Sequence, residues 1–186
     1  MHAERDVLTC FYNALGGATW NSACRTNWNT AADHSSWNGV LVYPGGTGVI
    51  AALQLPNCGL NGNMADAIAC LSVYTYKQYL LYLIFSSNNL KGPTPSISMF
   101  SGLKYFVVDN NKLTTPPPSV AELADMQIFA MNNNLLSGTL PSFSGLNNLE
   151  TVYMHSNFLF GPLQNWGGLP KLQNLVLKDN QVGSVH

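Results

Sequence analysis

The sequence predicts an α/β solenoid, in which similar coils of the chain stack on one another and each coil adds one strand to a curved, parallel sheet on the concave side. The first observation behind this prediction is a constant step of 23 residues between five asparagines: Asn88, Asn111, Asn134, Asn157 and Asn180. The second is that apolar residues recur at fixed distances from each asparagine. A period of about 20 to 50 residues is typical of repeat architectures, in which each coil packs against its neighbours.

Each repeat follows the pattern L-x-x-L-x-L-x-x-N-x-L, which is that of a leucine-rich repeat. The two strand positions before the asparagine are apolar in every repeat: Leu83 and Phe85, Phe106 and Val108, Phe129 and Met131, Val152 and Met154, Leu175 and Leu177. An earlier unit runs from Ile50 to Leu60 and has Cys58 in the asparagine position. The sequence therefore predicts six repeats, the first of which carries seven extra residues.

The alternation within each strand separates two faces of the sheet. Leu83 and Phe85 are expected in the core, whereas the residues between them point to the other side. The asparagine lies where the chain must turn out of the strand, and its amide can both donate to and accept from the backbone. The five stacked amides are expected to form a ladder that pairs buried backbone groups, each of which costs about 1–3 kcal/mol when unpaired. We therefore predict that these asparagines are structural.

Residues 1–48 are predicted to form an N-terminal cap, and residues 49–186 the solenoid. A helix is expected over residues 3–15, because it is followed by a Gly-Gly stop signal and its apolar residues have helical spacing. These apolar residues are Val7, Leu8, Phe11 and Leu15. Three tryptophans follow in the cap and are predicted to pack within it: Trp20, Trp28 and Trp37.

Two later segments depart from the regular repeat. Residues 64–79, inside the first repeat, begin with good helix formers and then become aromatic, so a helix on the convex side through about Leu71 is expected, followed by a loop. The chain reaches residues 182–186 partway through the sixth repeat without a polar closing segment. A C-terminal cap is therefore expected to be absent, and homo-oligomerisation through the open end is one hypothesis.

Composition argues against several classes of function. Charged residues make up only 9% of the chain, with 8 Lys and Arg against 9 Asp and Glu, which gives no basis for binding nucleic acid. No apolar run approaches the roughly 18 residues of a membrane span, so membrane insertion is not expected. The N-terminus lacks the basic and apolar segments of a secretory signal. The chain is expected to be either cytoplasmic or a mature form from which a signal has been removed.

Motifs in both the cap and the repeats carry a family resemblance. In the cap they are Phe11-Tyr-Asn-Ala, Trp20, Asn27-Trp28, Trp37-Asn-Gly-Val40 and Gly48-Val49. In the repeats, Gly92-x-x-Pro95, Gly138-x-Leu140-Pro141 and Gly161-x-Leu163 match the plant-type extension G-x-(I/L)-P. These motifs resemble extracellular leucine-rich repeat proteins, which include plant receptor-kinase ectodomains, polygalacturonase inhibitors and surface proteins of protists and bacteria. The resemblance implies a recognition module that is secreted or displayed at the cell surface.

The four cysteines, Cys10, Cys24, Cys58 and Cys70, are candidates for disulfides. The family's W-x-G-V-x-C motif ends here in Val42, so its usual cap disulfide cannot form in that way. Cys24 could pair with Cys10, and Cys58 with Cys70, but four cysteines allow three pairings and the sequence does not select one. Cys58 and Cys70 as unpaired, buried apolar residues are an equal alternative.

The concave face of the sheet is the predicted binding surface. Its apolar and aromatic residues are expected to form a stripe, called the strand stripe below: Tyr82, Ile84, Tyr105, Val107, Ile128 and Tyr153. Polar residues are expected to border it as a rim: Asp109, Asn132, His155 and Lys178. Contiguous exposed apolar surface usually marks an interaction site, and tyrosine is enriched in binding hot spots. The alternative is that β-branched and aromatic residues merely suit a sheet.

Catalysis is not expected. No His-Glu-x-x-His, Gly-x-Ser-x-Gly or Cys-x-x-Cys motif is present, and the four histidines are scattered. His155 beside Glu150 and Asp109 is a candidate acid–base cluster on the concave face. No cofactor and no metal site is predicted.

The leading hypothesis is a non-catalytic recognition module whose concave face binds a protein partner, for example an inhibitor of a secreted glycan-degrading enzyme. A self-associating structural surface protein and an intracellular scaffold are the alternatives. The nearly uncharged, polar surface also keeps a glycan ligand open.

Overall fold

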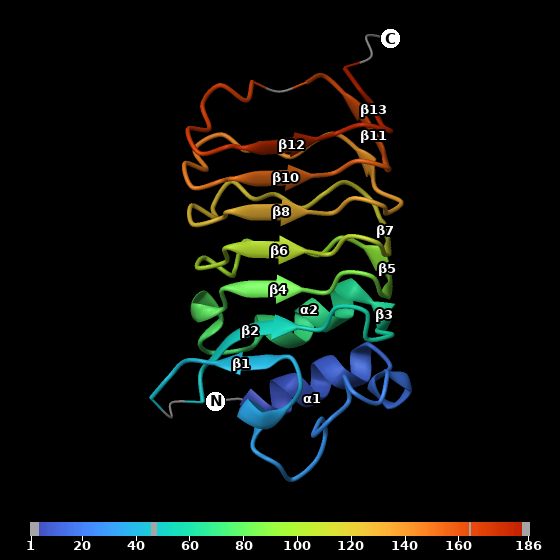
Figure 1. Ribbon diagram of the computed structural model, residues 1–186, viewed down its shortest axis with the longest axis vertical. Helices are drawn as coiled ribbons and strands as arrows, with labels where there is room; N and C mark the ends of the chain where they lie inside the picture. Colours follow the sequence, from blue (N-terminus) through green and yellow to red (C-terminus); the bar gives the residue numbers. More distant parts are fainter. Residues whose placement is uncertain (1–3, 46–47, 164, 184–186) are drawn as a thin grey trace.

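The computed structural model describes residues 4–45, 48–163 and 165–183. Within these residues one sheet runs the length of the molecule, with seven strands in the order β1-β2-β4-β6-β8-β10-β12, and is called the long sheet below (Figure 1). Six strands are parallel, one from each repeat: β2 (Ile50–Gln54), β4 (Tyr82–Ile84), β6 (Tyr105–Val107), β8 (Ile128–Ala130), β10 (Thr151–Tyr153) and β12 (Asn174–Val176). β1 (Val40–Val42) pairs antiparallel to β2 at the cap end. The predicted leucine-rich repeat solenoid is confirmed.

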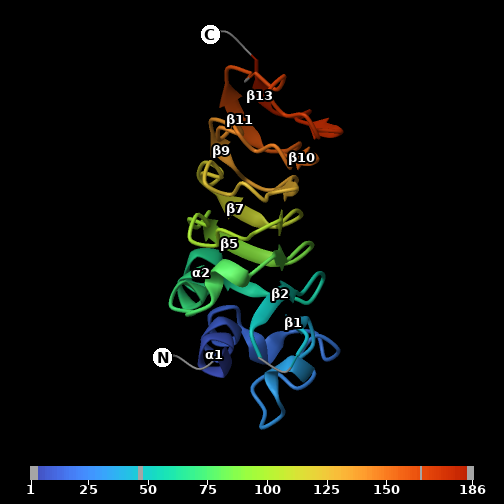
Figure 2. The ribbon, with the colours of Figure 1, turned by 90° about the vertical axis from the view of Figure 1, so that its left-hand side faces the viewer.

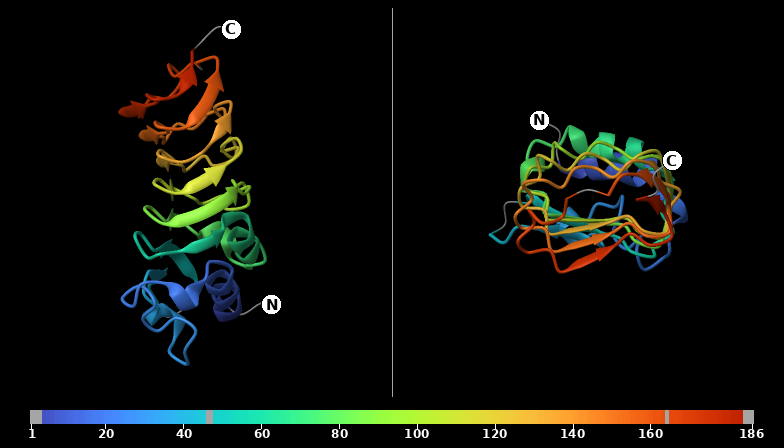
Figure 3. Two further views of the ribbon diagram at one scale, coloured as in Figure 1. Left: turned by 90° about the vertical axis from the view of Figure 1, so that its right-hand side faces the viewer. Right: turned by 90° about the horizontal axis from the view of Figure 1, so that it is seen from above.

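Shorter parallel strands follow the turn in each coil. Among the described residues they form two further sheets, the first of β3 (Asn61–Asn63), β5 (Asn89–Pro93) and β7 (Lys112–Thr114), the second of β9 (Ser137–Gly138), β11 (Phe158–Gly161) and β13 (Gln181–Val182). From the side, the coils rise as one stack above the cap (Figure 2). Along the stack they superpose as a flattened ring, with the long sheet on one side and the two helices on the other (Figure 3). Apolar side chains fill this ring from end to end, including the fully buried Leu83, Phe106, Phe129 and Val152.

The N-terminal cap is built on helix α1 (Glu4–Ala14), in the region where the sequence predicts a helix over residues 3–15. Its buried side covers the first coils, since the ring of Phe11 lies 5.4 Å from that of Phe85 in the second repeat, measured between centroids. The cap also contains 3-10 turns at Gly17–Thr19 and His34–Ser36. Trp28 packs between the other two cap tryptophans, with its ring centroid 5.1 Å from that of Trp20 and 5.1 Å from that of Trp37. All three are at most 3% exposed, so the predicted packing of the cap tryptophans is confirmed.

Helix α2 (Met64–Ser72) lies in the insertion of the first repeat, on the side away from the long sheet (Figure 3). It begins after Asn63, whose side-chain oxygen accepts a hydrogen bond from the backbone N–H of Ala65 at 2.9 Å and so pairs one of the free donors of the first turn. α2 packs against α1 and extends the apolar cover of the core. The helix expected through Leu71 thus ends one residue later, and the loop after it includes a 3-10 turn at Lys77–Tyr79.

Two disulfides join the cap to the first repeat, Cys10 to Cys70 and Cys24 to Cys58. The pairings considered from the sequence, Cys10 with Cys24 and Cys58 with Cys70, are therefore wrong, and so is the alternative in which Cys58 and Cys70 are unpaired. The physical reason is helix packing, because α1 and α2 lie against each other and bring together cysteines that are 60 residues apart. Beside the second disulfide, the backbone N–H of Asn21 donates to the carbonyl of Cys58 at 2.9 Å.

The repeat asparagines form one ladder through hydrogen bonds between their side chains and the backbone. In the middle of it, the side-chain nitrogen of Asn134 donates to the backbone carbonyls of Val108 and Met131, at 3.0 and 3.1 Å. Its side-chain oxygen accepts from the backbone N–H of Leu113 at 2.9 Å. The same bonds recur one coil away on either side, at Asn111 and Asn157. Each amide thus ties its own coil to the preceding one.

The residue before each ladder asparagine has a left-handed backbone, which the sequence pattern alone does not indicate. These residues have φ between 53° and 57°: Ser87, Asn110, Asn133, Ser156 and Asp179. Residues other than glycine rarely adopt this backbone conformation, and among them Asn and Asp tolerate it best. The sharp turn therefore has two parts, a left-handed residue that reverses the chain and an asparagine that pairs the backbone groups exposed by the reversal.

Tyr74, just after α2, makes the stability of the fold depend on pH in the alkaline range. Its side chain is 1% exposed, and its hydroxyl accepts a hydrogen bond from the backbone N–H of Ile50 at 2.7 Å. Burial raises the pKa of Tyr74 from 10.0 to about 12. Because the folded-state pKa lies above the unfolded value, the stabilisation is complete below pH 10 and is lost as the pH rises through 12.

We therefore expect the free energy of unfolding, measured by urea denaturation, to fall by on the order of 2 kcal/mol across this pH window. Tyr74→Phe should flatten the fall. Tyr79→Phe is the matched control, because the ring of Tyr79 is 48% exposed, and it should leave the fall unchanged. An equally steep loss in Tyr74→Phe would show that other groups cause it.

Candidate functional site

The outward face of the long sheet carries the residues that the sequence predicts as a binding stripe. Tyr82, Tyr105 and Ile128 occupy equivalent positions on β4, β6 and β8, and each is partly buried between its neighbours. The rings of Tyr82 and Tyr105 are in contact, with centroids 4.7 Å apart and planes tilted by 43°. The parallel register therefore produces a continuous ridge of large side chains across three coils.

A second column of the strand stripe lies beside the first. Ile84 and Val107 are register neighbours on β4 and β6, and both are partly buried. The next position is Ala130, which is 4% exposed, and it is followed by the partly buried Tyr153 on β10. Because the alanine side chain is a single methyl group, the column is low at β8 and rises again at Tyr153.

The four predicted rim residues also lie at one position of successive coils, just after the strands. Their exposure differs, since Lys178 is exposed and Asn132 is only 8% exposed. The Asp109 carboxylate accepts a hydrogen bond from the side chain of Asn110. The ring of His155 contacts that of Tyr153, with centroids 6.3 Å apart, and its Nδ1 is buried without a partner among the described residues. The rim therefore contains carboxylate, imidazole and ammonium groups, with Asn132 packed into the surface between them.

The acid–base cluster considered from the sequence does not assemble. Glu150 precedes β10 and His155 follows it, so an extended strand separates them by roughly 16 Å. Asp109 lies two strands away from His155 across the sheet, about 10 Å. Among the described residues no group of three His, Cys, Asp or Glu side chains could hold a metal ion. The face thus provides contact surface and hydrogen-bonding groups.

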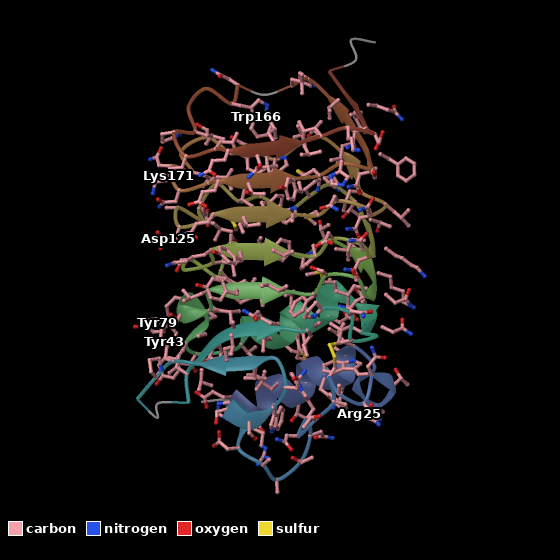
Figure 4. All side chains as sticks on the ribbon, viewed as in Figure 1. Arg25, Tyr43, Tyr79, Asp125, Trp166 and Lys171 are labelled. Carbon is pink, nitrogen blue, oxygen red and sulfur yellow. A yellow bond between two sulfur atoms is a disulfide. The ribbon has the colours of Figure 1, made fainter. Side chains whose placement is uncertain are left out.

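A second aromatic surface lies at the margin where the strands of the long sheet begin, and the repeat pattern does not indicate it. A pocket of about 420 Å³, called the margin pocket below, is lined by Tyr43, Pro44, Val49, Tyr76 and Tyr79. Figure 4 shows Tyr43 and Tyr79 close together at this margin. The available signal was three tyrosines within six residues, at positions 74, 76 and 79, in a segment expected to be a loop.

The six-repeat long sheet, the asparagine ladder and the helical cap define a leucine-rich repeat solenoid with a capped N-terminal end. None of the helices in the described part of the chain is long and apolar enough to cross a membrane. The same architecture is found in solved ectodomains of plant receptor kinases, with which the chain aligns over nearly its whole length.

The ectodomain of BIR2 from Arabidopsis thaliana superposes with a TM-score of 0.75 at 23% identity, covering 97% of this chain and 95% of that chain. The leucine-rich repeat ectodomain of the receptor kinase SOBIR1 from the same plant gives 0.73 at 20% identity, covering 97% and 96%. A chain of the Arabidopsis BIR3–SERK2 complex gives 0.72 at 21% identity, covering 97% and 95%. Neither a protein-family model nor a curated protein sequence matches the chain.

Proposed function

We propose that this protein is a non-catalytic recognition module of the extracellular space or the cell surface, and that it binds a protein partner on the outward face of the long sheet. The observation that carries the proposal is the strand stripe, in which tyrosine and aliphatic side chains form a ridge over consecutive coils. Contiguous apolar surface of this kind is unfavourable in water unless a partner covers it.

Two further observations support this assignment. The BIR3–SERK2 structure shows a chain of the same architecture in complex with a second protein. The two disulfides of the cap favour an oxidising compartment, because structural disulfides persist mainly in secreted and surface proteins and are rare in the cytosol. They count against the alternative of an intracellular scaffold.

The stripe and its rim would contribute differently to binding. Tyr82 and Tyr105 support each other through ring contact, so they present a large area with little conformational freedom left to lose on binding. The rim holds both signs of charge, at Asp109 and Lys178. Charges at a rim mainly set the orientation and the rate of association. We therefore expect the tyrosines to provide most of the affinity and the rim to provide the specificity.

The test is a capture experiment on an extracellular extract, with the immobilised protein as bait, followed by cross-linking to locate the contact. We expect the triple variant Tyr82→Ser, Tyr105→Ser, Tyr153→Ser to bind the captured protein about 100-fold more weakly, because hot-spot tyrosines contribute disproportionately to binding free energy. The matched control, called the flank control below, replaces with serine three exposed apolar residues outside the long sheet. They lie just before β9 or on β11: Leu135, Phe158 and Phe160.

The outcomes separate the hypotheses. Capture that depends on the stripe and survives the flank control would support the proposal. Equal capture by the stripe variant would refute the assignment of the face. Capture of only this same chain, together with a mass in solution that rises with concentration, would instead favour the self-associating surface protein.

A further inference from the structure

The margin pocket is a second candidate binding site, separate from the strand stripe. Its aromatic lining comes from two segments that are distant in the sequence: Tyr43 after β1, and Tyr76 and Tyr79 at the two ends of one 3-10 turn. With about 420 Å³, it falls within the roughly 300–1,000 Å³ of small-ligand sites. It opens at the margin where the strands start, whereas the stripe runs along the strands (Figure 4).

The walls of this pocket are held by hydrogen bonds of their own. The hydroxyl of Tyr43 donates to the backbone carbonyl of Tyr79 at 3.0 Å, which links the two sides. The backbone N–H of Tyr43 donates to the carbonyl of Val49 at 2.9 Å, and that of Tyr79 to the carbonyl of Tyr76 at 2.9 Å. Behind Tyr76 lies the buried ring of Tyr74, 6.1 Å away between centroids. The pocket is therefore formed before any ligand arrives.

The rings that line the pocket are tilted against one another and are not stacked. The planes of Tyr43 and Tyr79 are 79° apart with centroids at 6.1 Å, and those of Tyr76 and Tyr79 are 43° apart with centroids at 6.4 Å. The ring of Tyr79 is 48% exposed. An aromatic face offers an apolar, electron-rich surface to the C–H groups of a ligand, and the tyrosine hydroxyl at the ring edge adds a donor and an acceptor.

The lining contains no charged side chain among the described residues. Lys77 is next to Tyr76 in the chain but is not part of the lining. An ionic ligand would therefore lose its hydration without gaining a partner, which is costly. The pocket favours a neutral ligand with one flat apolar face and hydrogen-bonding groups around its edge.

We propose that the margin pocket binds a neutral, β-linked glucan oligosaccharide. A β-glucopyranose ring has its hydroxyls equatorial, so each ring face consists of axial C–H groups that can lie on a tyrosine, while the hydroxyls reach the pocket edge. A proline-rich peptide also binds aromatic surfaces, but it is an extended helix that rises about 3.1 Å per residue and needs a row of aromatic ridges. Here the three rings surround one hollow.

The experiment titrates the intact, disulfide-bonded protein by calorimetry with cellohexaose and with laminarihexaose, beside an oligogalacturonate and a decaproline peptide. We expect one of the two glucans to bind, and Tyr79→Ala to weaken that binding by about tenfold or more, as loss of an aromatic anchor does. Tyr79→Phe should bind like the wild type, because it keeps the ring face. Phe160→Ala is the matched control, since Phe160 is also 48% exposed but lies on β11.

A second measurement does not depend on variants. Titration of the wild type with the bound glucan should shift NMR signals of residues 43–45, 48–49 and 74–82 and leave those of β11 unchanged. The proposal is overturned if neither glucan binds, if Tyr79→Ala binds as tightly as the wild type, or if the shifts lie elsewhere. Binding of decaproline or oligogalacturonate in place of the glucans, lost in Tyr79→Ala, would also overturn the assignment of the ligand.

Discussion

Replacing Cys10 with serine and Cys70 with alanine is expected to lower the free energy of unfolding by about 4 kcal/mol. The disulfide between them closes a loop with a sequence separation of 60 residues, so its loss would give the unfolded chain a large gain in conformational freedom. It also joins α1 to α2, the two helices that cover the first coils on the side away from the long sheet (Figure 3). The Cys24–Cys58 disulfide closes a shorter loop of 34 residues, and a slightly smaller loss is expected there.

Urea denaturation followed by two signals would measure this effect. In a solenoid each coil contacts only its neighbours, so the cap could unfold before the rest. Three of the four tryptophans lie in the cap, so fluorescence follows mainly the cap, whereas circular dichroism follows the whole chain. We expect the fluorescence transition to move to lower urea by more than the dichroism transition.

The matched control for this variant is Ala69→Ser, an exposed substitution on the same helix. It should leave both transitions in place. Coincident, unshifted transitions in the cysteine variant would show that the disulfide adds nothing to the packing of α1 on α2.

The disulfide pairing shows where sequence reasoning reached its limit. The repeat period fixes which residues are equivalent from coil to coil, and it led directly to the ladder of Asn111, Asn134 and Asn157. The cap has no period. The neighbours of Cys10 and Cys24 depend on how α1 packs on the first coil, which is a matter of side-chain shape rather than spacing. Pairing by proximity in the sequence therefore gave the wrong partners.

The same contrast holds for the candidate sites. The strand stripe could be read from the sequence, because strand alternation and the parallel register determine which residues share a face. The margin pocket could not, because Tyr43 and Tyr79 approach each other through an irregular segment and a 3-10 turn. The unequal exposure of the rim residues could not be predicted from the repeat pattern either. Asn132 is almost fully buried although its position in the repeat equals that of the exposed Lys178.

The ladder also explains why the first repeat tolerates Cys58 in place of asparagine. Asn88, one coil later, accepts hydrogen bonds from the backbone N–H groups of Cys58 and Leu60, both at 3.0 Å. Its nitrogen donates to the carbonyl of Leu55 at 2.8 Å. The amide above therefore pairs the backbone groups of the first turn, and the disulfide to Cys24 fixes that turn to the cap.

Asn134→Ala in the middle of the ladder is expected to lower the free energy of unfolding by about 3–4 kcal/mol. Asn134 is 6% exposed, so the backbone N–H of Leu113 and the carbonyls of Val108 and Met131 would lose a partner that water cannot replace without opening the coil. These groups belong to two adjacent coils, so the substitution weakens the contact between coils as well as the turn itself. Thermal and urea unfolding by circular dichroism would measure the loss.

Asn180→Ala is the control within the ladder, since Asn180 makes the same bonds, to Leu159, Met154 and Leu177, at a partly exposed position. Water can reach these groups, so a loss of only about 1 kcal/mol is expected. Asn147→Ala, at an exposed position outside the ladder, should change stability by less than about 0.5 kcal/mol. Equal losses at Asn134 and Asn180 would mean that the amides act through local turn conformation. A loss that grows with burial would show that pairing of the buried backbone between coils is what the asparagines contribute.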